Sequence, residues 1–507
     1  MQSANIEHIV IVGGGTAGWM TAAALANRLP QKLCRITLVE SDVIGTVGVG
    51  ESTIPHIRQF NQTLGIDEAT FIKKTHATVK LGIKFNDWGN IGDSYFHPFG
   101  EHGEITQGID FHQYWLKARS LGETYGLEQY SIAAMAGFAG KFPLSTSNKP
   151  TVFADYTYSY HIDASAYAAF LSDYAQQRGV QRIEGKVVKV NQHLNDFVQS
   201  ITLESGQTIE GDLFIDCSGF KALLIDGTLN TPYLDWSQWL PTDSAVAAPC
   251  EHAPGDHSSS KGKIALQPYT QATARVSGWQ WQIPLQHRIG NGHVFTSAFL
   301  SDQHATDILM NSLPGKALAN PKILRFKAGR RQYSWQKNVV AIGLSSGFLE
   351  PLESTSIYLI QLGVSKLLEL FPDKAFRQAE MNEYNRSICQ QYELIRNFII
   401  LHFHVTKRND SPFWDYCRNM AIPDELQHLL TLFAESGRTD LAQFGVWPAV
   451  CIGQNIIPQH YDARLDNIDA EQIKQLMANH RHKIQSMLAT FPQADDYIQE
   501  LLTRGTR

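Results

Sequence analysis

The chain has 507 residues, of which 43% are hydrophobic and 18% are charged, and its formal net charge is −6. This composition is typical of a globular protein large enough for two or three domains. The small negative charge gives no attraction to nucleic acid or to an anionic membrane, so we expect neither partner. The sequence contains no apolar run long enough to span a bilayer.

The first residues and the cysteines indicate the compartment. A strand-like run, HIVIV at residues 8–12, begins before a basic region, an apolar core and a cleavage site could fit, so we expect no secretory signal. The six cysteines lie far apart, form no CxxC pair, and are too few for a disulfide framework in a chain of this length. They are Cys34, Cys217, Cys250, Cys389, Cys417 and Cys451. We therefore predict a cytoplasmic protein with reduced thiols and no metal site.

Residues 8–40 predict a strand, a glycine turn, a helix and a second strand. The motif GxGxxG is formed by Gly13, Gly15 and Gly18, and Glu40 ends the second strand about twenty residues later. Glycines permit close backbone approach to a pyrophosphate, the helix N-terminus offers amides to it, and an acidic residue can bind a ribose. In this context a dinucleotide site is favoured over a purely structural turn.

A second segment of the same sheet is expected at residues 211–219, GDLFIDCSG. There Asp216 could meet a ribose or the flavin chain, although an aspartate that ends a strand is more often a turn former. Two such segments favour FAD over NAD. Only one GxGxxG is present, so we expect no second dinucleotide site from which NAD(P)H could reduce the flavin in place.

The hydrophobic pattern of the remaining chain predicts strands, a loop and a mostly helical region. Residues 70–95 alternate as a strand should, and 151–225 predict further strands around a helix. Residues 250–263, CEHAPGDHSSSKGK, predict a surface loop or lid. From about residue 357 the pattern is mostly helical, with 400–414 and 447–454 as interruptions.

These motifs together resemble the flavin-dependent tryptophan halogenases over nearly the whole chain. WQWQIP, with Trp279, Trp281, Ile283 and Pro284, is the signature of these enzymes; by pattern alone it predicts a core strand with two tryptophans on one face. In the family it is thought to keep the organic substrate away from the flavin. The other matching blocks are at residues 13–25, 48–55, 80–88, 96–100, 160–171, 212–220, 347–355 and 396–414.

The resemblance implies an α/β, FAD-binding Rossmann-like fold of the single-component flavin monooxygenase type, with an interwoven substrate region and a mostly helical C-terminal part. We assign the domains as follows: a discontinuous FAD-binding module (1–90, 151–225 and 330–375), a substrate-side sheet with loops (91–150 and 226–329), and a helical region that completes the substrate pocket (376–507).

The resemblance also implies the chemistry. Reduced FAD, oxygen and chloride or bromide yield hypohalous acid, which travels through the protein to Lys80 and is held against one carbon of an electron-rich aromatic ring. By pattern alone Lys80 would share a solvated strand face with Lys84. The matching glutamate is Glu353, which polarises the electrophile and takes the ring proton; by pattern alone it would be an acidic residue beside a helix N-cap.

The further site residues also follow from the resemblance. The halide is expected at the backbone amides of Thr355 and Ser356, where many relatives have glycine in place of Ser356. The aromatic clamp on the substrate is expected at His97 and Phe99, with Trp447 as a ring contact. Further FAD contacts are expected at Thr16, Ala17, Ser52, Val187, Leu344 and Ile357.

Two alternative functions share part of this pattern. A flavin-dependent aromatic hydroxylase would need the glycine motif but not Lys80, Glu353 or WQWQIP. A silent flavin-binding protein would have lost Lys80 or Glu353, and both are present.

The substrate and partners are expected as follows. Enzymes of the family that act on free tryptophan bind its head group with adjacent tyrosines and a glutamate, which are not evident in residues 436–454. We therefore expect indole or a substituted indole in preference to tryptophan. The other expected partner is a separate flavin reductase that supplies reduced FAD, and a homodimer is one assembly that the sequence allows.

Overall fold

The computed structural model describes residues 5–30, 32, 34–43, 50–143, 156–253, 266–439 and 446–504. The chain forms two compact units, and each unit is built from three separate segments. The first unit contains residues 1–76, 162–241 and 326–393, and the second contains 77–161, 242–325 and 394–507. The assignment of an FAD module, a substrate-side sheet and a C-terminal region stays a prediction.

A six-stranded sheet with the strand order β20-β21-β12-β1-β2-β8 forms the centre of the first unit. Its strands are β1 (His8–Val12), β2 (Arg35–Glu40), β8 (Gln181–Glu184), β12 (Leu213–Asp216), β20 (Trp335–Gln336) and β21 (Val339–Ala341). All neighbours pair in parallel except β20 with β21. Strand β1 is buried along its whole length, as expected for a central parallel strand. The predicted return of the chain to the first sheet is confirmed, because β12 pairs with β1.

Helices cover this sheet. Helix α1 (Thr16–Arg28) packs against α6 (Ala164–Gln176) and α8 (Ser356–Glu369). The unit also contains α2 (His56–Thr63), α3 (Glu68–Thr75), the short helices η3 (Gly219–Lys221), η4 (Gly343–Ser345) and η5 (Pro351–Glu353), and strand β3 (Glu51–Ser52). Two small sheets consist of β9 (Val187–Gln192), β10 (Val198–Leu203) and β11 (Thr208–Glu210), and of β13 (Tyr233–Asp235), β19 (Gly329–Arg331) and β22 (Gly347–Phe348). Residues 70–75, predicted as strand, are helical in α3 because Asp67 caps that helix.

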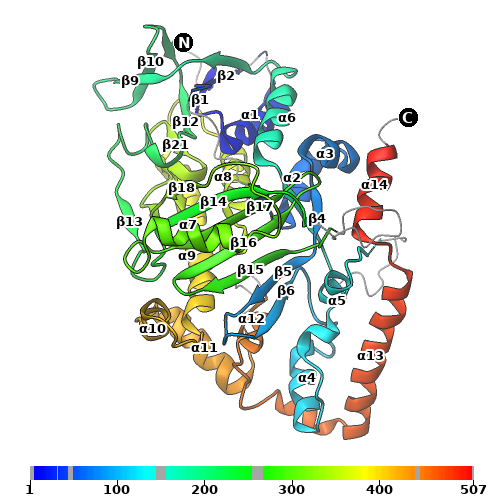
Figure 1. Ribbon diagram of the computed structural model, residues 1–507. Helices are drawn as coiled ribbons and strands as arrows, with labels where there is room; N and C mark the ends of the chain where they lie inside the picture. The colour runs from blue at the N-terminus through cyan, green and yellow to red at the C-terminus, as the bar shows by residue number, and fades with distance from the viewer. Residues whose placement is uncertain are drawn as a thin grey trace. The chain divides into compact units, whose positions relative to one another are not determined.

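The second unit is built on a seven-stranded sheet with the order β18-β14-β17-β16-β15-β5-β6. Its strands are β5 (Gly82–Asn86), β6 (Ser94–Pro98), β14 (Ser244–Cys250), β15 (Thr270–Arg275), β16 (Gly278–Pro284), β17 (Ile289–Phe295) and β18 (Lys322–Arg325). The only parallel pair among these described strands is β15 with β5. Helix α7 (Asp302–Asn311) lies against β14 and β17 (Figure 1). A short antiparallel pair, β4 (Thr78–Lys80) with β7 (Ser159–Ile162), completes the strands.

The second unit also contains several further helices. They are α4 (Phe111–Ser120), η1 (Leu127–Tyr130), α5 (Ile132–Phe138), α10 (Pro412–Asn419), α11 (Asp424–Ser436), α12 (Trp447–Gly453), η6 (Ala463–Asn467), α13 (Ala470–Thr490) and α14 (Ala494–Arg504). Helices α4 and α13 pack side by side around a buried cluster that includes Trp115 and Met477 (Figure 1).

The predicted interruptions of the helical region are wrong in part. Helix α9 (Gln378–His404) continues through residues 400–404, and residues 447–453 form α12. Aromatic and β-branched side chains weaken a helical pattern in the sequence, but burial of these residues outweighs the small difference in propensity.

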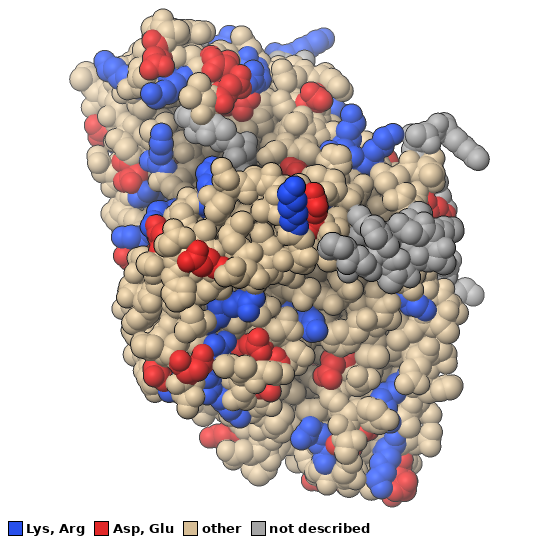
Figure 2. All heavy atoms as spheres, in the orientation of Figure 1, with Lys and Arg blue, Asp and Glu red and all other residues tan. Residues whose placement is uncertain are grey.

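The charges on the surface and the state of the cysteines can be compared with the expectations from the composition. Lysine and arginine are interspersed with aspartate and glutamate on the face shown in Figure 2. Among the described residues, no helix is both long and apolar enough to cross a membrane. All six cysteines are described, and none forms a disulfide. Most of the predicted loop at 250–263 lies outside the described residues; Cys250 itself ends β14.

Candidate functional site

The glycine motif forms the turn between β1 and α1. The Gly13 backbone is in the left-handed region, with φ +114°, and its N–H donates to the Val39 carbonyl at 2.8 Å. A Cβ at Gly13 would lie 2.2 Å from the Cys217 carbonyl oxygen, and one at Gly18 would lie 1.8 Å from the Gly13 oxygen. Only glycine fits either position. The turn thus brings backbone amides close to whatever binds at this end of α1.

The start of α1 is open to a ligand. Gly15 is the N-cap and supplies no side-chain cap, and residues 13–17, including Thr16 and Ala17, are half-buried. The first-turn amides of a helix have no partner within the helix and carry the positive end of its dipole. An anion such as a pyrophosphate therefore suits this position.

Glu40 lies beside the turn and is held by an ion pair. Its Oε1 accepts a hydrogen bond from Arg182 Nε at 2.5 Å, and its Oε2 accepts a longer one from Trp19 Nε1 at 3.4 Å. The hydrogen bond with Glu40 is the main cause that raises the pKa of Arg182. Arg182 also pairs with Asp42. The pair fixes the Glu40 carboxylate near the glycines, where it could still accept ribose hydroxyls with its remaining lone pairs.

Asp216 is fully buried at the end of β12 and is used locally. Its Oδ1 accepts hydrogen bonds from the backbone and hydroxyl of Ser218, and its Oδ2 accepts from the amides of Leu224 at 2.7 Å and Ile225 at 2.9 Å. These four bonds build the turn after the strand. A direct contact with the flavin stays a prediction.

Helix α8 and η4 lie next to the glycine turn. Gly343 is so close to α1 that its Cβ would lie 2.8 Å from the Ala17 Cβ, and Ile360 of α8 is the next neighbour. Leu344, in η4, is half-buried and Ile357, at the start of α8, is buried. Three predicted FAD segments therefore meet within the first unit. Besides Glu40 and Asp216, two further predicted contacts lie on other strands: Ser52 is buried in β3 and Val187 is half-buried in β9.

The predicted base and halide residues form one turn before α8. Glu353 ends η5 and is 2% exposed, and Ser354 adopts a left-handed conformation with φ +59°. Thr355 is the N-cap of α8, is buried, and makes no side-chain cap hydrogen bond. The helix begins at Ser356, one residue before the predicted start of the helical pattern. The turn therefore separates the carboxylate from the helix start by a sharp reversal of the backbone.

Gln361 is a residue that the sequence reasoning missed. It is 5% exposed in α8, one turn after Ile357, and neither its Oε1 nor its Nε2 has a hydrogen-bond partner among the described residues. Burying an amide without partners is costly, so such a group indicates a bound molecule or water. Its signal in the sequence is a glutamine within the apolar face formed by Ile357, Ile360 and Val364. Together with the open glycine turn, it fits an FAD site in this unit.

Lys80 ends β4 in the second unit and is 0% exposed, so the solvated alternative is wrong. Its Nζ lies 4.8 Å from the ring centroid of Phe99. His161, also 0% exposed, hydrogen-bonds Thr78 Oγ1 at 2.9 Å and Thr270 Oγ1 at 3.0 Å. Burial and, second, the charge of Lys80 hold the pKa of His161 well below its usual value. The ammonium thus lies among an aromatic face and a neutral imidazole.

His97 and Trp447 are linked by an aromatic residue that the sequence did not indicate. The His97 ring packs at 5.4 Å against Phe398, and Phe398 packs at 6.1 Å against Trp447. The Val446 backbone N–H donates to His97 Nε2 at 3.3 Å. Phe398 lies in α9 and is fully buried, and the sequence analysis did not single it out. Two of the predicted substrate contacts, His97 and Trp447, are therefore joined through Phe398 into one aromatic group.

The signature strand β16 has its two tryptophans on one face, as its pattern predicts. Trp279 and Trp281 are 6.1 Å apart and buried, and Trp88 joins them at 6.4 Å from Trp279. Gly292 lies opposite Trp281, where a Cβ would come within 2.0 Å of the indole. Ile283 is buried and Pro284 is half-buried at the strand end. The motif is rigid core; its role toward the substrate stays a prediction.

The comparisons with known proteins identify the family. The family model for tryptophan halogenase matches residues 8–470. Tryptophan 6-halogenase SttH from Streptomyces toxytricini is 34% identical over 447 residues, which cover 84% of this chain and 83% of that protein. Tryptophan 7-halogenase RebH from Lentzea aerocolonigenes is also 34% identical and covers 85% of this chain and 82% of that protein.

Solved structures of halogenases have the same fold as this chain. BrvH, a flavin-dependent halogenase from Brevundimonas sp. BAL3, superposes with a TM-score of 0.93 at 42% identity, covering 98% of this chain and 100% of that one. A flavin-dependent halogenase from Xanthomonas campestris gives 0.91 at 40% identity, covering 98% of each chain. The predicted fold class is confirmed, and the hydroxylase alternative is not favoured. The chain belongs to the tryptophan halogenase family and is a flavin-dependent halogenase that uses FAD and a halide ion.

Proposed function

We propose that Lys80 directs the halogen onto the substrate. The supporting observation is its burial: a lysine with no exposed surface is rare unless it has a task or a partner, and this one lies 4.8 Å from the Phe99 ring. An ammonium at this position can donate hydrogen bonds to hypohalous acid and hold it beside a flat ring. The halogen replaces a ring hydrogen, and the hydroxide and the ring proton leave as water.

Glu353 takes the ring proton in this proposal, and the amides of Thr355 and Ser356 hold the halide. The support for the first role is a buried carboxylate on a short turn, where a proton acceptor is held in one orientation. The support for the second is the start of α8, which has no side-chain cap at Thr355. When bound, FAD in its reduced form supplies the electrons that oxygen needs to oxidise the halide.

The substrate is proposed to be indole or a substituted indole without an amino-acid head group. Around His97, Phe398 and Trp447 the contacts are aromatic. A zwitterion would need charged partners in the same place, and burying it without them would cost several kcal/mol. A separate flavin reductase is the proposed electron source, because the chain contains one GxGxxG.

The test compares Lys80→Ala with Lys84→Ala. Lys84 is on the next strand and half-buried, so its removal changes the charge equally without touching the proposed site. We expect Lys80→Ala to abolish the formation of halogenated indole. FAD binding should stay near the wild-type level, and so should the production of hypohalous acid, which is measured with a halogen-trapping dione. Lys84→Ala should keep most of the activity.

The assay uses chemically reduced FAD, oxygen and bromide, and reads products by mass. Regioselective product from Lys80→Ala would remove the lysine from the mechanism. A hydroxylated product from the wild type would favour the hydroxylase.

A further inference from the structure

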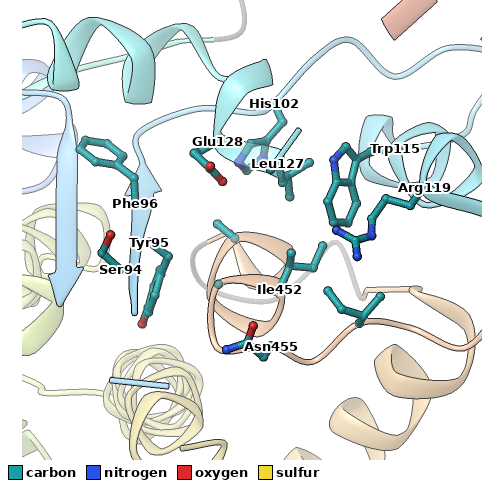
Figure 3. Close-up of a pocket in the computed structure, with 14 residues that line it drawn as sticks. Ser94, Tyr95, Phe96, His102, Trp115, Arg119, Leu127, Glu128, Ile452 and Asn455 are labelled. Atoms are coloured by element: carbon teal, nitrogen blue, oxygen red, sulfur yellow. The ribbon is translucent and has the colours of Figure 1, made fainter. Parts of the chain in front are cut away.

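The second unit contains a cavity of about 240 Å³ away from the proposed substrate contacts. Figure 3 shows its walls: edge strand β6 on one side, α4 on the other, and α12 below the loop that carries His102. Its lining residues are Ser94, Tyr95, Phe96, His102, Trp115, Arg119, Gly126, Leu127, Glu128, Ala449, Ile452, Gly453, Asn455 and Ile457.

The cavity is a separate site. Lys80, His97, Phe99 and Trp447 are not among its lining residues. Along β6, Phe96 lines the cavity, whereas the next residue, His97, contacts Phe398. Helix α12 packs tightly on this strand, since a Cβ at Gly453 would lie 2.4 Å from the Tyr95 ring. The cavity and the proposed substrate contacts therefore share β6 and α12 but have no lining residue in common.

His102 is the feature that points to a ligand. Its side chain is 4% exposed, and it makes no hydrogen bond with any residue that the structure describes. Burial and, to a lesser extent, His112, His97 and His480 lower the pKa of His102 to about 3. The ring is therefore neutral at physiological pH, with one N–H donor and one acceptor nitrogen. A buried group of this kind needs a partner, and the cavity is where one can be supplied.

The apolar part of the wall is formed by aromatic and aliphatic side chains, and it lies beside the polar side chains of Ser94, Arg119, Glu128 and Asn455. Trp115 is 1% exposed, Phe96 2% and Leu127 3%. The Trp115 Nε1 already donates to the Tyr125 carbonyl at 3.0 Å, so the indole offers the cavity carbon atoms only. The charged residues Glu128 and Arg119 lie on different sides of the cavity (Figure 3). They are not placed to receive the adjacent charges of one amino-acid head group.

We propose that this cavity binds a small neutral aromatic molecule of one or two fused rings, whose ring N–H or O–H donates to His102. The volume supports this size, because pockets for drug-sized ligands measure about 300–1,000 Å³ and a single water needs far less. The site does not depend on the roles proposed for Lys80 and Glu353.

The first experiment locates and counts the sites. Crystals soaked in 5-bromoindole are expected to show anomalous bromine density in the cavity. Calorimetric titration with indole should show one binding event fewer in Ile457→Trp, which fills the rim at a residue that is 41% exposed. Ile105→Trp, at a residue that is 60% exposed and outside the lining, should match the wild type.

The second experiment tests the hydrogen bond. Indene has the shape of indole but no N–H, and we expect the cavity to bind it at least tenfold more weakly. In His102→Phe that difference should disappear, with folding checked by the melting temperature. Bromine density only outside the cavity, equal titrations of the two tryptophan variants, or an indole preference that survives in His102→Phe would each overturn the proposal.

Discussion

At the scale of single residues, the position of Glu353 makes a kinetic prediction. The carboxylate is 2% exposed on the turn before α8, and glutamine keeps its size while removing its basicity. We expect Glu353→Gln to slow halogenation by about 10²-fold, the scale on which a lost general base acts. The control is Glu369→Gln, at the far end of the same helix. The measurement is the turnover number of each variant with saturating indole. An unchanged turnover number in Glu353→Gln would show that Glu353 has a structural role only.

His293 predicts how stability depends on pH. It is 0% exposed on β17, and burial is the main cause that lowers its pKa to about 4, with the Ala305 carbonyl opposing. The unfolded chain binds this proton near pH 6.5, so the stabilisation is present above that pH and is lost as pH falls from about 6.5 to 4. Within this pH range the free energy of unfolding falls by about 1.4 kcal/mol per pH unit.

The measurement is urea unfolding at several pH values. Between pH 6.5 and 5, the slope of the unfolding free energy against pH should be smaller in His293→Gln than in the wild type. The difference should correspond to the uptake of about one proton on unfolding. His428→Gln, at an exposed position in α11, should leave the slope unchanged. Identical slopes in all three proteins would contradict the assignment.

At the scale of elements, the turn between β1 and α1 can be tested against another glycine turn. Gly13 and Gly206 both have positive φ, but a Cβ at Gly13 would lie 2.2 Å from a carbonyl oxygen, whereas nothing lies within 4 Å of one at Gly206. Gly206→Ala should therefore cost only backbone strain, about 1–3 kcal/mol. Gly13→Ala should destabilise more and also weaken FAD binding. Melting temperatures and flavin titrations separate the two effects; equal behaviour of the variants would show that the close approach is unimportant.

The same elements show how far sequence reasoning reaches. The first βαβ unit was predictable because HIVIV, three glycines and Glu40 are local signals that all agree. Residues 447–453 were not, because their helix depends on burial of Trp447 and Val450, which the pattern does not show. Lys80 is similar: alternation placed it on a polar strand face, but in the fold β4 pairs with β7 and the side chain is 0% exposed. Gln361 is notable because its buried amide has no hydrogen-bond partner among the described residues, and Phe398 because His97 and Trp447, which are distant in sequence, pack against it.

At the scale of the whole molecule, the substrate is the main prediction. With equal concentrations of indole and tryptophan, reduced FAD and bromide, we expect brominated indole to dominate the products. The reason is the aromatic surroundings of Trp447 and the absence of the tyrosine pair and glutamate from residues 436–454. Preferential bromination of tryptophan, read by mass, would show that partners for the head group lie elsewhere in the chain.

The order of strands in the first sheet also affects how the protein is made. Strand β1 ends at Val12, but its neighbour β12 begins at Leu213 and β21 follows only at Val339. At ribosomal rates of about 5–20 residues per second, β1 waits on the order of 10–40 s for β12. During that time one edge of a strand whose last four residues are apolar has no partner and is a place where nascent chains can aggregate. Production of the halogenase should therefore depend more on chaperone capacity and slow synthesis at low temperature than its final stability would suggest.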